Sequence, residues 1–188
     1  ISALAAGNRV IIKPSEMTPN VSNLISGMIN ELFEPNRVAI FQGDQNVAQS
    51  LLKYPFHHIF FVGSPSVGKI VMAEAAKHLS SITLELGGKT PTIIDKTANV
   101  KMAINKLAWG KCLNLGQSCI SPDYILIHES KKNEFLEGLS KKINDVYGES
   151  YEEKKNSGHL ARIVNQRHWD RLDSLITSSI DKGANIVH

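Results

Sequence analysis

The chain has 188 residues, 42% hydrophobic and 21% charged, a composition typical of a folded globular protein rather than a disordered one. Lysine and arginine number 21 against 18 aspartates and glutamates, and this slight, scattered excess argues against a nucleic-acid partner. No apolar run approaches the roughly 18 residues of a membrane span. Two cysteines are too few for a disulfide framework, so we expect a reducing, intracellular compartment such as the cytoplasm. The chain starts inside an apolar phrase without Met, which predicts an internal piece of a longer protein.

Short strand-like runs alternate with helical patterns in the first part of the chain. We expect strands at residues 9–12, 38–41, 58–62 and 82–84, with short helices after residue 44 and near residue 67. Thr18 and Pro19 have the residue types of an N-cap and a first helical turn. An apolar helical stripe follows them, formed by Val21, Leu24, Ile25, Met28, Ile29 and Leu32. This alternation predicts an α/β fold, with a parallel sheet that binds ligands at the carboxyl ends of its strands.

The pattern changes after the Gly87-Gly88 pair. Further strands are expected at residues 91–95 and 124–127, and helices from Val100, over 135–146 and over 169–180. Residues 148–158 are polar and predict a loop. We therefore expect two domains, residues 1–86 and residues 87–188.

The segment from Gly63 to Lys69 is a near match to the phosphate loop G-x-x-x-x-G-K-[ST] and lies between a predicted strand and a predicted helix. Its eighth position is Ile70, which has no hydroxyl for a nucleotide-bound magnesium ion, so a nucleoside triphosphatase is disfavoured. Gly63, Ser64 and the helix N-terminus could still bind a phosphate or pyrophosphate. The alternative is a tight turn that binds nothing.

Cys119 lies in a loop rich in Gly, Ser and Asn, where neighbouring N–H dipoles favour a thiolate nucleophile. The alternative for a free cysteine is a small buried apolar residue, an interpretation that suits Cys112 on the preceding predicted helix. Glu85 ends a strand beside two glycines and is a candidate general base, or else a solvated carboxylate. The seven histidines show no metal-ligand spacing, and no metal is predicted.

Four motifs occur here in the order and spacing of one family. They are Lys13-Pro-Ser-Glu16, Phe61-Val-Gly63-Ser64 with Val67-Gly68, Glu85-Leu-Gly-Gly-Lys89, and Gly116-Gln-Ser-Cys119. Through them the chain resembles the aldehyde dehydrogenase superfamily along essentially its whole length. The phrases Lys69-Ile-Val-Met72 and Ser121-Pro-Asp-Tyr124 are similar to its class 3, fatty-aldehyde branch.

The resemblance implies a Rossmann-like cofactor sheet, in residues 1–86, followed by part of an α/β catalytic domain. It implies NAD(P)-dependent oxidation of an aldehyde, medium- or long-chain, to a carboxylate through a thiohemiacetal and a thioester. Cys119 would be the nucleophile and Glu85 the base that activates water. The cofactor would be NAD, with NADP possible, because the Glu16 carboxylate repels a 2′-phosphate. Its contacts would come from Lys13 and Glu16 at the adenosine ribose, Gly43 at the adenine side, Gly63 and Ser64 at the pyrophosphate, and Gly87 at the nicotinamide.

Two departures qualify the resemblance. Val62 replaces the threonine usual in the family. The family's oxyanion-stabilising asparagine would lie upstream of Ile1 and its ribose-binding glutamate downstream of His188, so we expect this polypeptide alone to be inactive. The parent is expected to be a homodimer, with membrane association only through segments absent here. The alternative is a non-catalytic or truncated relative that binds a nucleotide or a partner without turnover.

Overall fold

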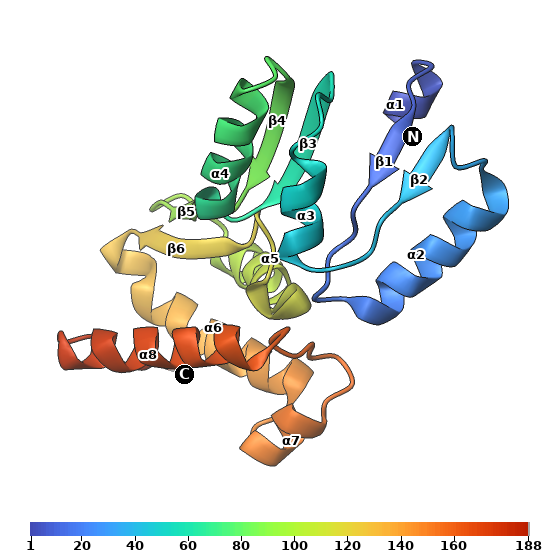
Figure 1. Ribbon diagram of the computed structural model, residues 1–188. Helices are drawn as coiled ribbons and strands as arrows, with labels where there is room; N and C mark the ends of the chain where they lie inside the picture. Colours follow the sequence, from blue (N-terminus) through green and yellow to red (C-terminus); the bar gives the residue numbers. More distant parts are fainter. Residues whose placement is uncertain (188) are drawn as a thin grey trace. The chain divides into compact units, whose positions relative to one another are not determined.

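The computed structural model describes residues 1–187, in which helices and strands alternate up to β4 and three consecutive helices end the chain (Figure 1). The chain divides into two units, Ile1–Glu85 and Leu86–His188. The predicted α/β class is confirmed, and the predicted strands and helices are found within a few residues of their expected bounds.

The first unit carries α1 (Ser2–Ala5), β1 (Val10–Ile12), α2 (Pro19–Leu32), β2 (Val38–Ile40), α3 (Gln45–Leu51), β3 (His58–Gly63), α4 (Pro65–Ala76) and β4 (Ser81–Leu86). Strands β1 and β2 are parallel, with Val10 opposite Val38 and Ile12 opposite Ile40. Strands β3 and β4 form a second pair. Within the described residues the four strands therefore pair two by two, and do not join into the one continuous sheet that the alternation predicted.

Helix α2 begins where the sequence predicted, with Thr18 at its N-cap and Pro19 in its first turn. Its apolar stripe is largely exposed, since Val21, Leu24 and Met28 keep half or more of their surface accessible. The helix packs on β2 and buries Ser22 instead. Within the first unit no described element buries these three side chains, so here the apolar periodicity marks the helix but not its buried face.

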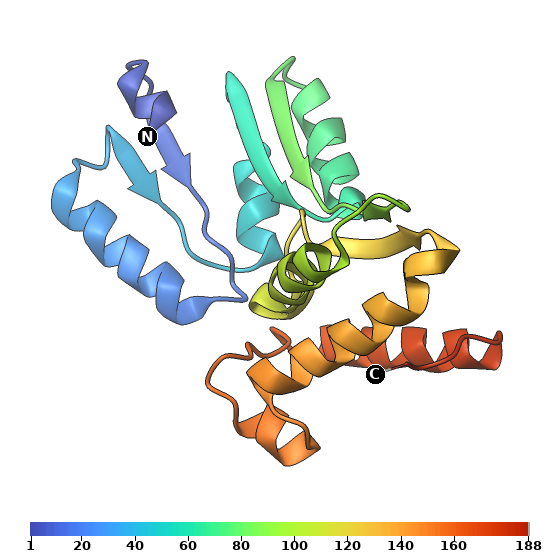
Figure 2. The ribbon, with the colours of Figure 1, turned by 180° about the vertical axis from the view of Figure 1, so that it is seen from behind.

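The second unit carries β5 (Thr90–Ile94), α5 (Val100–Cys112), a 3₁₀ turn η1 (Leu113–Gly116), β6 (Pro122–Ile127), α6 (Glu129–Tyr147), α7 (Tyr151–Asn156) and α8 (Gln166–Asp181). Strands β5 and β6 are parallel, and α6 packs beside α5, as the view from behind shows (Figure 2). The buried core joins β5, α5 and α6 through Ile94, Val100, Leu107 and Phe135, and Ile125 and Ile127 of β6 pack against it. A crossover helix on a parallel pair places the β5 and β6 termini, and the loop before β6, at defined positions.

Helix α7 corrects the prediction of a loop over residues 148–158. Gly148, with φ +104°, ends α6, and a capping box then starts α7. The Ser150 Oγ accepts a hydrogen bond from the Glu153 backbone N–H at 3.2 Å, and the Glu153 carboxylate accepts one from the Ser150 N–H at 2.9 Å. Two otherwise unpaired backbone donors are thereby satisfied, which stabilises a helix that polarity alone does not predict.

Candidate active site

Two segments that follow β1 and β2 meet at the carboxyl ends of this parallel pair. The Lys13 ammonium lies 2.6 Å from the Glu16 carboxylate, and this hydrogen bond is the main reason that the pKa of Glu16 is lowered. Glu16 and Gly43 line one cavity of about 190 Å³ together with Pro14, Ser15, Pro19, Ser22 and Gln42. Three residues that the sequence assigned to one cofactor thus come together. The ammonium donor and carboxylate acceptor suit a ligand with neighbouring hydroxyl groups.

A glycine turn and a buried hydrogen bond shape the backbone around this cavity. Gly43 has φ +141°, and a Cβ there would overlap the Val47 side chain, so the turn into α3 requires glycine. Ser22 is only 3% exposed, and its hydroxyl donates a 2.8 Å hydrogen bond to the Ser15 carbonyl oxygen. Ser22 was not predicted as a site residue; the only signal for it is a serine inside a helix interior.

Gly63 ends β3, and Ser64 caps the twelve-residue helix α4, as the phosphate-site prediction requires. The Ser64 Oγ accepts a hydrogen bond from the Val67 N–H at 3.3 Å, and Pro65 has no N–H to offer. An anion bound here would therefore accept hydrogen bonds from the other backbone N–H groups of this turn.

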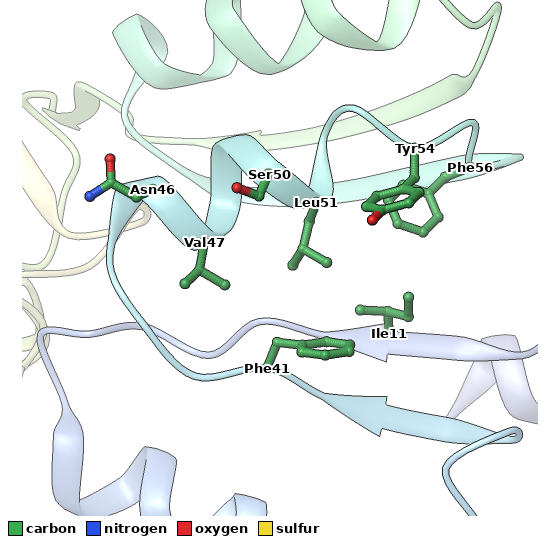
Figure 3. Close-up of a pocket in the computed structure, with 8 residues that line it drawn as sticks. All are labelled: Ile11, Phe41, Asn46, Val47, Ser50, Leu51, Tyr54 and Phe56. Atoms are coloured by element: carbon green, nitrogen blue, oxygen red, sulfur yellow. The ribbon is translucent and has the colours of Figure 1, made fainter.

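The larger cavity of the first unit lies elsewhere. It has a volume of about 510 Å³ and a mostly apolar lining of Ile11, Phe41, Asn46, Val47, Ser50, Leu51, Tyr54 and Phe56 (Figure 3). The Tyr54 and Phe56 rings stand together, with centroids 6.5 Å apart. None of the predicted site residues lines this cavity, so size alone does not identify the candidate site.

In the second unit, Cys119 occupies a turn between η1 and β6 and is exposed. The Ser121 N–H donates to the Ser118 carbonyl at 3.2 Å, which closes this turn around the cysteine. A Cβ at Gly88 would lie 2.6 Å from the Cys119 carbonyl oxygen, so only glycine permits the backbone to approach the turn this closely. Sequence reasoning chose Gly87, whose Cβ position has no neighbour within 4 Å among the described residues, and missed Gly88.

Glu85 is exposed near the end of β4 and belongs to the first unit, whereas Gly87 and Cys119 belong to the second. The sequence-predicted residues of the first unit thus fall into a Lys13, Glu16 and Gly43 group and a Gly63 and Ser64 turn, with Glu85 near the end of β4. In the second unit, Gly87 directly precedes Gly88, which contacts the Cys119 turn. A salt bridge that was not predicted joins Lys89 to Asp123 at 3.1 Å, at the start of the β5 and β6 pair.

The two cysteines have different environments. Cys112 is half-buried at the end of α5, where burial raises the pKa of its thiol and a hydrogen bond with the Tyr147 side chain opposes that shift. Tyr147 is buried, and its pKa is raised first by burial and then by Cys112. Of the two thiols, Cys119 is the more accessible to a reagent in solution.

Across residues 1–187 no His, Cys, Asp and Glu side chains gather in a group of three or more that could hold a metal ion. No helix in that range combines the length and the apolar character needed to cross a membrane.

Comparison with known proteins decides the family. The model of the aldehyde dehydrogenase family matches residues 1–188. The chain belongs to the aldehyde dehydrogenase family. The family that the four motifs predicted is therefore confirmed.

The predicted class 3 resemblance is confirmed, because the relatives include a mouse aldehyde dehydrogenase family 3 member A2 that is 42% identical over 94% of this chain. A 4,4'-diaponeurosporen-aldehyde dehydrogenase of Staphylococcus aureus is 46% identical over 95% of the chain, and a mouse dimeric NADP-preferring aldehyde dehydrogenase is 44% identical over 95%. A solved structure of a substrate-bound Staphylococcus aureus aldehyde dehydrogenase superposes with a TM-score of 0.89 at 46% identity, over 95% of this chain. The chain spans 38% of the length of the Staphylococcus relative, 39% of the mouse relative and 38% of the solved chain.

Proposed function

We propose that the full-length protein oxidises a medium- or long-chain aldehyde to its carboxylate with NAD(P)⁺, using Cys119 as the nucleophile. The observation that carries this proposal is the position of Cys119, exposed in a closed turn at the start of β6 and within the family's Gly-Gln-Ser-Cys motif. A substrate carbonyl can reach such a sulfur without any rearrangement of the core.

The cofactor is assigned to the first unit. The Lys13 and Glu16 pair beside the cavity of about 190 Å³ supplies a donor and an acceptor for the ribose hydroxyls, and Gly43 keeps the backbone close. When bound, NAD(P)⁺ supplies a hydride acceptor. The Glu16 carboxylate disfavours a 2′-phosphate by charge repulsion, although the mouse relative carries an NADP-preferring name. We therefore assign NAD as the preferred cofactor.

The reaction follows from the groups of this chain. The Cys119 thiolate adds to the aldehyde carbon, and its own backbone N–H donates to the oxyanion that forms. Loss of hydride from that carbon leaves an acyl thioester on the sulfur. Glu85 takes a proton from water, the resulting hydroxyl adds to the thioester, and the thiolate departs as the carboxylate is released. These steps balance, because the substrate is oxidised by two electrons that leave as hydride.

Substrate class and assembly are proposed from the relatives. A relative named for 4,4'-diaponeurosporen-aldehyde supports an extended apolar substrate, and one named dimeric supports a homodimer. Residues 1–86 would form part of the cofactor domain and residues 87–188 part of the catalytic domain.

The experiment is a Cys119→Ala substitution in the full-length protein, with Cys112→Ala as the matched cysteine control. We expect aldehyde oxidation to fall by on the order of 10⁴-fold or more, since the covalent route is lost, while NAD binding by calorimetry stays unchanged. Cys112→Ala should retain turnover. Substantial activity of Cys119→Ala would overturn the nucleophile assignment, and loss of both activity and NAD binding in Cys119→Ala would mean that the residue is structural.

A further inference from the structure

The residues directly before Cys119 adopt an uncommon backbone conformation. Asn114 has φ 51° and ψ 30°, Leu115 has φ 52° and ψ 36°, and Gly116 follows with φ +72°. A left-handed conformation is unfavourable by roughly 1–2 kcal/mol for each residue with a side chain. Two such residues in succession persist only where their surroundings hold them. Something must therefore fix this segment, which leads directly into the cysteine turn.

The side chain of Gln117 supplies the first part of that restraint. Its Nε2 donates to the Asn114 carbonyl oxygen at 2.9 Å, and the Asn114 Nδ2 donates back to the Gln117 carbonyl oxygen at 3.1 Å. The Gln117 backbone N–H also donates to the Asn114 carbonyl oxygen at 3.1 Å. These reciprocal bonds close a ring across the left-handed residues and offset their intrinsic instability.

The same amide also reaches a segment 45 residues further along the chain. Its Nε2 donates to the Arg162 carbonyl oxygen at 3.0 Å, and its Oε1 accepts from the Val164 N–H at 3.0 Å. An acceptor at one residue and a donor two residues later are the pair that a β-strand offers to a neighbouring strand. The Gln117 amide thus takes the place of a peptide unit and joins the cysteine loop to residues 162–164.

Residues 162–164 are themselves anchored. The Arg162 guanidinium donates to the carbonyl oxygens of Leu160 and Ala161, at 2.8 and 3.2 Å, and to that of Lys155 on α7. Only a side chain with two N–H donors and one acceptor at this reach satisfies all three partners of the Gln117 amide. Asparagine is one methylene shorter, and glutamate has no N–H.

We propose that Gln117 is a positioning residue that fixes the sulfur of Cys119 by clamping its loop to residues 162–164. The proposal rests on the proposed role of Cys119 as the nucleophile. Gln117 acts on the reaction only through the backbone two residues before the sulfur. It belongs to the second unit, whereas Lys13 and Glu16 belong to the first. Its loss should therefore slow thiol chemistry and leave NAD binding as it is.

The test uses Gln117→Glu and Gln117→Met in the full-length protein, with Gln166→Glu on α8 as the charge-matched control. Gln166 makes one hydrogen bond, to Asp170 on its own helix. Because a misplacement of about 1 Å reduces rates by roughly 10²-fold, we expect kcat to fall about tenfold to a hundredfold in both Gln117 variants. The rate of Cys119 alkylation by iodoacetamide should fall together with kcat, while the Kd for NAD stays within about twofold of the unsubstituted value.

A pH profile separates positioning from general destabilisation. In Gln117→Glu the introduced carboxylate faces two carbonyl oxygens, and protonation restores one donor. The activity of Gln117→Glu relative to the unsubstituted protein should therefore rise as the pH falls from about 8 to about 5.5. Gln117→Met, which cannot titrate, should show no such rise. Gln166→Glu should match the unsubstituted protein throughout.

The proposal is overturned if Gln117→Met alkylates and turns over within about twofold of the unsubstituted protein, or if the Gln117→Glu profile is flat. Equal losses of kcat and NAD affinity would also overturn it, because they indicate a structural role. If Cys119→Ala itself retains turnover, the proposed function fails instead, and the alkylation data still decide whether Gln117 controls the loop.

Discussion

Substituting Gly88 with alanine tests how closely the Cys119 turn is packed. A Cβ at Gly88 would lie 2.6 Å from the Cys119 carbonyl oxygen, whereas Cβ contacts below 3.0 Å are essentially never seen and ordinary contact begins at 3.4 Å. The two atoms must therefore separate by at least 0.4 Å, the difference between 2.6 and 3.0 Å, and by 0.8 Å to reach ordinary contact. The obstructing atom is backbone, so no side chain can rotate away.

From this displacement we expect Gly88→Ala to lower kcat by on the order of tenfold to a hundredfold, since about 1 Å of misplacement reduces rates by roughly 10²-fold. Overpacking should also lower the free energy of unfolding by about 1–3 kcal/mol. The matched control is Gly110→Ala in α5, where the new Cβ meets Pro122 at an ordinary 3.6 Å. This control should keep its activity and gain about 0.5–1 kcal/mol, because alanine favours a helix interior.

The assay is NADH production by the full-length variants with a fatty aldehyde, together with thermal unfolding followed by circular dichroism. If Gly88→Ala were as active and as stable as Gly110→Ala, the turn would not be packed against Gly88, and the positioning argument for Cys119 would be refuted.

Three further predictions concern the base, the cofactor pair and the isolated chain. Glu85→Gln should still give a burst of NADH in stopped-flow absorbance but accumulate the thioester, since no base then activates water; equal loss of both steps would leave Glu85 with a structural role only. Lys13→Met should raise the pKa of Glu16 toward its ordinary 4.5, because the lowered pKa comes mainly from the Lys13 hydrogen bond; an unchanged NMR titration of Glu16 would contradict this. The ionised Glu16 stabilises the folded protein at pH values above the pKa that Glu16 has in the unfolded chain. This contribution is lost as the pH falls through the lowered pKa of the folded protein. In Lys13→Met the contribution of Glu16 to the free energy of unfolding should therefore be smaller. The isolated 188-residue chain should self-associate on a sizing column and show no aldehyde oxidation. The reason is that Phe60 and Val62 on β3 are exposed, and β3 pairs with β4 alone among the described residues. An active monomer would contradict this prediction.

Local patterns predicted the elements of the fold well. The strand at Val10–Ile12 and the helix after Thr18 follow from a short apolar run and from the cap with its proline, signals that act over a few residues. Helix α7 was missed, although the Ser150 and Glu153 spacing was readable, because the polarity of the segment was given more weight than the capping box. The buried face of α2 was not predictable from its apolar stripe, since burial depends on which element packs against the helix.

Site residues were predicted only where they belong to a recognisable sequence motif. Lys13, Glu16 and Gly43 came from the family resemblance, and the structure places the last two in one cavity. The contact of Gly88 with the Cys119 carbonyl and the bonds from Gln117 to residues 162–164 join distant parts of the sequence. Such contacts are set by tertiary packing, so local periodicity and propensity do not predict them.

The central claim, that Cys119 carries the acyl group, is tested most directly by peptide mass spectrometry of the full-length Glu85→Gln variant quenched after mixing with aldehyde and NAD. We expect the mass of the acyl group on the peptide containing Cys119, formed in step with the NADH burst, and none on the peptide containing Cys112. NADH formation with the acyl group on another residue, or with no covalent adduct at all, would contradict the account.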